Sequence, residues 1–234
     1  MTTPAALVEL VDTWISKGSP AQEPIRWNTE RWLPPSVDQY PYVAAHAGLI
    51  RGLPDRIGRP DVAALGAFAA QSPEDAERAF VASMVWGFGR TGYAVYRTNR
   101  ILDDNPDAAV KLQHAARVLA NDGPVEGYRA MANEQHLKWL GPAFGTKYLG
   151  FCSCPDNPAL ILDALVATWL NEYCGTALRP TRWSTAQYER YLANMAAWSA
   201  GRCTPTELET LVFVEEASRR EGNQWAPRST KEQP

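Results

Sequence analysis

Apolar residues recur at helical spacing along most of the chain. Near the amino terminus, Leu7, Leu10, Val11 and Trp14 follow the i, i+3, i+4 rhythm of an amphipathic helix, and Gly18 suits its C-terminal end. No stretch of useful length alternates apolar and polar residues as a half-buried strand would. The pattern therefore predicts an all-α fold.

Helix-start signals divide the rest of the chain into further segments. Most combine a capping side chain with a proline, an acidic residue or a glutamine in the first turn, and the start at 124 rests on its proline. The expected helix starts are at residues 72, 105, 124, 184 and 204. The segment that begins at Pro124 is expected to run to Leu140, whereas the Pro- and Trp-rich stretch 19–41 is expected to be irregular.

Composition bounds the class of protein. The chain has 234 residues, of which 45% are hydrophobic and 21% charged, values that exclude a mostly disordered chain. No run approaches the roughly 20 apolar residues of a membrane span, and the first residues lack the basic region of a signal peptide. We expect a cytoplasmic protein with one helical domain over residues 1–222 and a polar tail over 223–234.

Charge and metal-binding residue types give little sign of a partner or a cofactor. Lys and Arg number 23 and Asp and Glu 26, so the net charge is −3 and only a local basic face could attract a polyanion. The spacing of the four cysteines fits no zinc or iron–sulfur pattern, and the three histidines form no paired motif. Reduced thiols, no metal site and no cofactor are expected.

Residues 137–147 contain a Gly-Pro turn between two apolar segments. The pattern predicts a helical hairpin at about 137–150, with its second helix beginning near Thr146. The start of such a helix exposes backbone N–H groups that bind anions, DNA phosphates among them. A Gly/Pro turn between helices is nevertheless common, so the turn alone does not indicate nucleic-acid binding.

Two charged residues near this turn each have an ordinary interpretation. Asp163 interrupts the apolar run 159–170 where a helix should begin, which favours an N-cap that contributes about 1 kcal/mol. Lys147, taken alone, is typical of a solvated surface lysine. At a helix N-terminus, however, the macrodipole would disfavour its charged form, and an amine nucleophile must be uncharged.

Together the two segments resemble a known enzyme family. Leu-Gly-Pro-Ala-Phe-Gly-Thr-Lys at 140–147, followed by Leu-Asp at 162–163, is similar to the helix–hairpin–helix DNA glycosylases, and most of all to the 8-oxoguanine DNA glycosylases. Their hairpin reads approximately L-P-G-V-G-x-K. The resemblance, which covers about residues 137–170, implies that Lys147 is the catalytic lysine and Asp163 the essential aspartate. Gly145 matches the second hairpin glycine, and Ala143 replaces the first.

The resemblance also implies an architecture and an activity. It implies two helical lobes with a cleft between them, a monomer, and a duplex DNA partner that carries a damaged or modified base. The implied activity is base-excision removal of an oxidised purine such as 8-oxoguanine, with Schiff-base lyase activity at the abasic site. The residues that would contact DNA at the hairpin are Gly141, Ala143, Gly145 and Thr146.

Base excision also requires a pocket for the extruded base. Aromatic walls are expected because the base must leave the duplex stack. The candidates are Trp86, Phe88, Phe144, Trp198 and Trp225, although core packing is the more common role of such residues. Arg90, Arg97 and Arg100, or Lys138 with Lys147, could form a phosphate-facing patch, and a solvated helix face explains them equally well.

Three alternatives remain open from the sequence. The chain could be a noncatalytic helix–hairpin–helix module that holds DNA by its phosphates and does not need Asp163. It could be a helical protein with no nucleic-acid role, which the acidic composition favours. It could also be a glycosylase without lyase activity, in which Asp163 activates water and Lys147 contacts phosphate.

Overall fold

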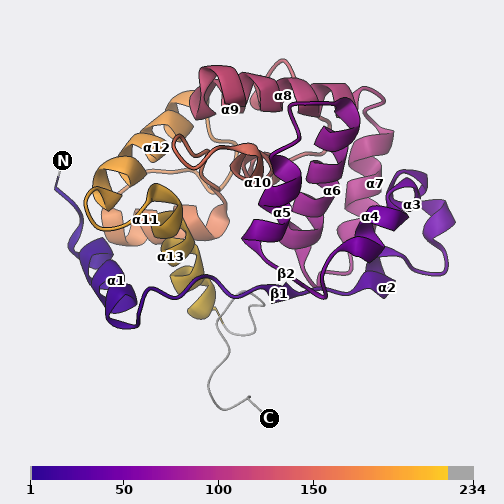
Figure 1. Cartoon of the computed structure of the whole chain (residues 1–234). Helices are drawn as coiled ribbons and strands as arrows, with labels where there is room; N and C mark the ends of the chain where they lie inside the picture. The colour runs from indigo at the N-terminus through magenta and orange to yellow at the C-terminus, as the bar shows by residue number, and fades with distance from the viewer. Residues whose placement is uncertain (1, 221–234) are drawn as a thin grey trace, which may run out of the picture. The chain divides into compact units, whose positions relative to one another are not determined.

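The computed structural model describes residues 2–220, and the backbone divides into two compact units (Figure 1). One unit comprises residues 24–161. The other joins the amino-terminal residues up to 23 with the chain from residue 162 onward. The expected tail 223–234 and the pocket candidate Trp225 lie outside the described residues.

The unit formed by residues 24–161 is built around one buried helix. Helix α6 (Pro73–Phe88) packs against α5, α7, α8 and α10, and nine of its sixteen residues are buried. The other elements of this unit are β1 (Ile25–Arg26), α2 (Thr29–Trp32), η1 (Val37–Gln39), α3 (Pro41–Ala45), α4 (Ala47–Gly52), β2 (Arg56–Ile57), α5 (Arg59–Gly66), α7 (Ala94–Asp103), α8 (Ala108–Asp122), α9 (Pro124–Ala132) and α10 (Pro142–Cys152).

The unit formed by residues 2–23 and 162–220 contains four helices. These are α1 (Ala5–Ser16), α11 (Ala164–Cys174), α12 (Thr185–Ser199) and α13 (Pro205–Ser218). Helix α13 contacts the other three, and α1 also contacts α11. Residues Leu208, Val212 and Phe213 of α13 are buried. The amino-terminal helix therefore completes a core that is otherwise made by the last third of the chain.

The expectation of an all-α fold is confirmed. Across residues 2–220 the only strands are the two-residue segments β1 and β2, which pair antiparallel. The expected caps at Ser72, Ser184 and Thr204 are confirmed, since each side chain accepts a hydrogen bond from the backbone N–H three residues later. The expected start at residue 105 is wrong, because α8 begins at Ala108 without a side-chain cap and the Asn105 side chain bonds Ile101 and Lys138 instead. Residues 2–220 include no helix with the length and apolar character of a membrane span.

The predicted boundaries around the Gly-Pro turn are wrong. Helix α9 ends at Ala132 rather than Leu140, because the Asn133 side chain turns back to donate to the Arg129 carbonyl (2.7 Å) and satisfies a terminal acceptor. Helix α10 begins at Pro142 rather than near Thr146, because proline's fixed φ suits the first helical position and Gly141 precedes it as N-cap. The connection is therefore the whole of 133–141.

Candidate active-site residues

Lys147 lies in the second turn of α10 and is buried. Its side chain is 5% exposed, and its Nζ atom lies 5.6 Å from the centroid of the Phe144 ring. The sequence pattern placed this amine at the start of a helix that begins near Thr146, where the helix dipole would act on it. That placement is wrong, because α10 begins five residues before Lys147 and the dipole acts mainly within the first turn. Burial against an aromatic face is instead the feature that distinguishes this lysine.

Three residues of α6 and α10 surround the Lys147 stem. The Phe144 ring lies against Phe88, with centroids 4.5 Å apart and planes inclined by 30°. Gly87 leaves the room for both α10 side chains, because a Cβ there would stand 2.5 Å from Phe144 Cε1 and 3.1 Å from Lys147 Cδ. We call Gly87, Phe88, Phe144 and Lys147 the lysine cluster. Two expected pocket residues and the expected nucleophile thus lie together.

The start of α10 presents backbone rather than side chains. The N–H groups of Phe144 and Gly145 both bond the Gly141 carbonyl, and Pro142 has no N–H, so the donor without a helical partner is that of Ala143. Thr146 is fully buried, and its hydroxyl donates to the Ala143 carbonyl (3.1 Å). Of the four expected hairpin contacts, Gly141 and Ala143 are thus partly exposed, whereas Gly145 and Thr146 are buried.

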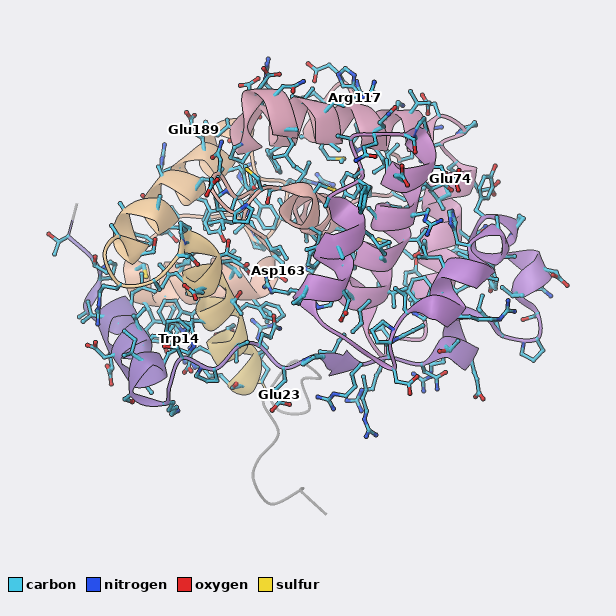
Figure 2. The ribbon with its side chains drawn as sticks, in the orientation of Figure 1. Trp14, Glu23, Glu74, Arg117, Asp163 and Glu189 are labelled. Carbon is cyan, nitrogen blue, oxygen red and sulfur yellow. The ribbon has the colours of Figure 1, made fainter. Side chains whose placement is uncertain are left out.

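Asp163 is the N-cap of α11. Its Oδ1 accepts hydrogen bonds from the backbone N–H groups of Leu165 (3.0 Å) and Val166 (3.2 Å), as the position in the sequence predicts (Figure 2). The residue is 8% exposed. The cap holds the carboxylate in one orientation through these two bonds.

The candidate residues are divided between the two units. The lysine cluster and the start of α10 belong to residues 24–161, whereas Asp163 and Trp198 belong to the other unit. Trp86 is 1% exposed in the α6 core, where it packs edge-on to Phe151 with ring centroids 5.1 Å apart. Trp198 of α12 is 5% exposed, and its indole N–H has no hydrogen-bond partner among the described residues.

The groups that follow Lys147 on α10 are chemically inert near neutral pH. Burial raises the pKa of Cys152 to about 12 and holds the pKa of Tyr148 well above its usual range. The Tyr148 hydroxyl donates to the Leu112 carbonyl (3.0 Å), which fixes α10 to α8. These side chains therefore position the helix and do not exchange protons in a reaction. None of the four cysteines forms a disulfide.

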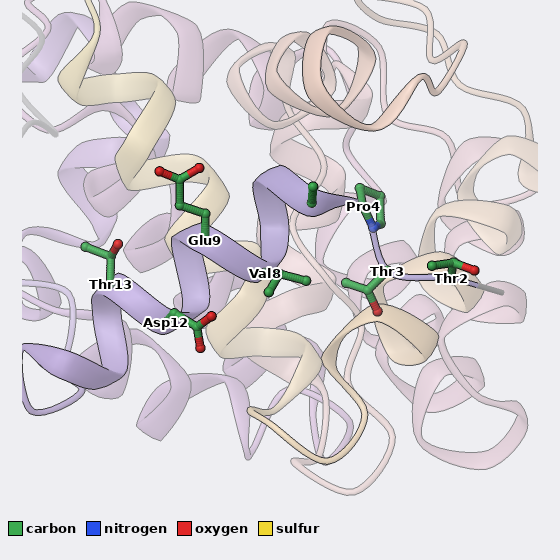
Figure 3. A pocket seen from close by; sticks show the side chains of 8 residues that line it. Thr2, Thr3, Pro4, Val8, Glu9, Asp12 and Thr13 are labelled. Atoms are coloured by element: carbon green, nitrogen blue, oxygen red, sulfur yellow. The ribbon is translucent and has the colours of Figure 1, made fainter.

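Two hollows in the described surface lie away from these residues. The one along α1 is lined by residues 2–5, 8, 9, 12 and 13, and it carries the carboxylates of Glu9 and Asp12 (Figure 3). The other is lined by residues 26–30, 55 and 56. An acidic hollow repels phosphate, so the first is no candidate for DNA binding. Within residues 2–220 no group of three or more His, Cys, Asp or Glu could hold a metal ion.

Sequence reasoning missed the roles of Gly87 and Trp139. The glycines at 87 and 89 indicate a helix end, and α6 does end at Phe88 with Gly89 as its C-cap, but the contact of Gly87 with α10 depends on tertiary packing. Trp139 has a φ of +68°, a conformation that no local motif predicts for a tryptophan. Its neighbours on α7 are Arg97 and Arg100, two of the expected phosphate-patch arginines.

Comparison with protein families gives one match. A family described as "Putative 8-oxoguanine DNA glycosylase OGG-like protein" matches residues 18–213, a range that includes both Lys147 and Asp163. Comparison with curated proteins and with solved structures gives no match.

Proposed function

The chain belongs to this family of 8-oxoguanine DNA glycosylase OGG-like proteins, and from that premise we propose that it excises an oxidised purine such as 8-oxoguanine from duplex DNA and then cleaves the abasic strand. The observation that carries the proposal is the family match over residues 18–213, which takes in the whole of α10 and the start of α11. The burial of Lys147 supports its assignment as the nucleophile.

In the proposed reaction the neutral Lys147 amine attacks C1′ of the damaged nucleotide. The N-glycosidic bond breaks, and its electron pair leaves with the base, which takes up a proton. The new C1′–N bond costs the amine a proton; the C1′–O4′ bond then breaks, O4′ takes up a proton as a hydroxyl, and an iminium forms between Nζ and C1′. Loss of a C2′ proton expels the 3′ phosphate by β-elimination, and water finally hydrolyses the iminium to release the lysine. No metal or redox partner is needed.

Asp163 has a separate role in this proposal. A carboxylate beside the sugar stabilises the positive charge that develops on C1′ as the base departs, and it can accept a proton from the attacking amine. The two α11 backbone donors hold one of its oxygens in place for this task. The proposal requires that Asp163 and Lys147 face the same sugar when DNA is bound.

The extruded base needs aromatic contacts and hydrogen-bond donors. The Phe88–Phe144 pair beside Lys147 supplies aromatic surface at the reacting atom. Trp198 of the other unit, whose indole N–H has no partner among the described residues, and the buried Trp86 stay candidates for this role.

The test is a single-turnover reaction on a duplex with one 8-oxoguanine opposite cytosine. The proposal predicts free 8-oxoguanine by chromatography and, without alkali, a strand break at the lesion in a denaturing gel. An undamaged duplex of the same sequence is the control. Base release without a strand break would support the glycosylase activity and refute the lyase activity. DNA binding without base release would favour the noncatalytic module.

A further inference from the structure

The loop before α10 holds an exposed tryptophan in a strained backbone. Trp139 has a φ of +68°, a region that bulky residues rarely adopt, and the residue is 42% exposed. Such a conformation persists only when the surrounding contacts determine it, and it is most frequent at functional sites. The contacts that hold Trp139 therefore bear on what this loop does.

The first set of contacts fixes the loop to the end of α7. Asn105 is 5% exposed, and its Oδ1 accepts from the Lys138 N–H (2.9 Å). Its Nδ2 donates to the Lys138 carbonyl (3.3 Å) and to the Ile101 carbonyl (2.6 Å). One buried amide thus holds the residue before Trp139 from both sides, which makes this part of the loop rigid.

The second set fixes Trp139 itself. Arg97 donates to the Trp139 carbonyl, and the Trp139 indole N–H donates to the Asp104 carboxylate. The Arg100 guanidinium lies over the ring, 3.5 Å from its centroid, and pairs with Asp104 at 3.7 Å. The indole is therefore oriented before any ligand arrives, which lowers the entropy lost when a ligand binds to it.

Two tyrosines extend the aromatic surface around this indole. Tyr93 and Tyr96 are 50% and 42% exposed, with ring centroids 5.3 Å apart, and Arg100 donates to the Tyr96 hydroxyl (3.2 Å). Of the seven large hydrophobic side chains exposed within residues 2–220, Tyr93, Tyr96 and Trp139 are three. We call residues Tyr93, Tyr96, Arg97, Arg100, Asp104 and Trp139 the Trp139 cluster. It is a patch rather than scattered exposure.

Local charge favours an anionic partner for this patch. Arg97, Arg100 and the exposed Lys138 outnumber Asp103 and Asp104, although the whole chain has a net charge of −3. Because Arg97 bonds an uncharged carbonyl, its positive charge is not neutralised there. Exposed aromatic rings with interleaved cations are the surface on which unpaired bases stack while their phosphates are held nearby.

We propose that the Trp139 cluster binds an unpaired nucleobase of the DNA, which stacks on the Trp139 indole while a neighbouring phosphate contacts Arg97 or Lys138. This inference rests on the proposed function and specifies how the DNA is held. It is supported by chain continuity, because Trp139 lies two residues before Gly141, the N-cap of the helix that carries Lys147. A base stacked on Trp139 would therefore contact the loop that leads directly into α10, and the first turn of α10 presents the Ala143 N–H.

The test measures binding of the full chain to a duplex with a single bulged base and to the fully paired duplex, both without a lesion. Trp139→Ala is expected to weaken binding to the bulged duplex about 10-fold or more, as expected for loss of one aromatic stack, and to change binding to the paired duplex much less. Trp139→Phe should restore most of the loss, because it keeps an aromatic face. Phe68→Ala, an exposed aromatic outside the cluster, is the matched control and should have no effect.

A direct readout accompanies the affinities. With 5-iodouracil as the bulged base, irradiation should cross-link the DNA to the peptide that contains Trp139. If Trp139→Ala lowers the melting temperature, Trp139→Leu replaces it as a non-aromatic variant of similar bulk. Equal affinities for all Trp139 variants, or a cross-link elsewhere, would overturn the inference and leave a protein partner as the occupant of this patch.

The outcome is separable from that of the proposed function. If binding to the bulged duplex depends on Trp139 but the protein releases no base, the Trp139 cluster is supported and the proposed enzyme activity is refuted. If the protein releases the base but binding to the bulged duplex does not depend on Trp139, the enzyme activity is supported and the role of the Trp139 cluster is refuted.

Discussion

At the scale of single residues, Gly87 determines the packing around Lys147. Its missing side chain leaves space for the Phe144 ring and the Lys147 stem, which would lie 2.5 Å and 3.1 Å from a Cβ at this position. Phe144 is only half-buried, so its ring can move outward, and Lys147 would be displaced with it. The position of the amine thus depends on a glycine of a different helix.

Gly87→Ala is predicted to impair chemistry more than stability. The methyl group displaces Phe144 and Lys147, and we expect single-turnover strand cleavage to slow by about 10-fold or more, the scale expected for a misplaced reacting group. Helix propensity favours alanine by about 1 kcal/mol and offsets part of the clash, so the melting temperature should change little. Gly48→Ala in α4, where nothing lies within 4 Å of the added Cβ, is the control. Equal cleavage rates for both variants would refute the packing argument.

At the scale of elements, the helix caps could be predicted from sequence and the hairpin could not. Capping depends on residues a few positions apart, so the sequence identifies Ser72, Asp163, Ser184 and Thr204 as N-caps. The end of α9 involves a local bond from Asn133 to the Arg129 carbonyl, whereas the next loop is held by the buried Asn105, whose bond to Lys138 is tertiary. The apolar residues Leu137 and Leu140 continue a helical pattern although both serve the core from a loop.

Substitutions at Asp163 can separate capping from catalysis. Asp163→Asn keeps a side-chain oxygen for the Leu165 and Val166 N–H groups, so the free energy of unfolding should change by less than about 0.5 kcal/mol. Asp163→Ala removes the cap and should cost about 1 kcal/mol. Both should lose base release by at least about 100-fold, because neither has the carboxylate charge. Denaturant unfolding and chromatography of the released base measure the two effects.

Retained base release in Asp163→Asn would contradict the catalytic role and leave Asp163 as a cap alone. Ser184→Ala, which removes the α12 cap, is the matched control for lost capping. It should lower stability by a similar amount and leave base release unchanged.

At the scale of the whole molecule, buried thiols and phenols make stability depend on alkaline pH. Burial raises the pKa values of Cys152, Cys174 and Tyr128 to about 12, from ordinary values of 9.0 for the thiols and 10.0 for the phenol. The unfolded chain therefore loses these protons at lower pH than the folded chain. Their contribution to stability is fully present below about pH 9 and is lost as the pH rises toward 12.

The variant Cys152→Ala/Cys174→Ala is predicted to show a shallower alkaline loss of stability than the wild type. The two thiols add to the loss of stability between their unfolded and folded pKa values, and solvent around the partly exposed Cys174 reduces its share. Urea unfolding between pH 8 and 10.5 measures the slope. Cys154→Ala, at an exposed position, should leave it unchanged. Parallel curves for the double variant and the wild type would show that burial does not shift these groups.

The sequence also predicted the family, from the residue types in two short segments. The residues at 140–147 and 162–163 indicated the glycosylase family, and the family match agrees. Local pattern could not place Phe88 and Phe144 against one another, because they come from α6 and α10, more than fifty residues apart. Nor could it show that the first 23 residues pack with the last third of the chain.

Covalent trapping tests the central claim, that Lys147 is the nucleophile, most directly. Borohydride reduces an iminium to a stable amine, so incubation with 8-oxoguanine duplex and borohydride should link the wild-type chain to DNA. Mass spectrometry should map the adduct to Lys147, and Lys147→Gln should form none while its melting temperature stays close to that of the wild type. An adduct that persists in folded Lys147→Gln, or one that maps to another lysine, would contradict the account.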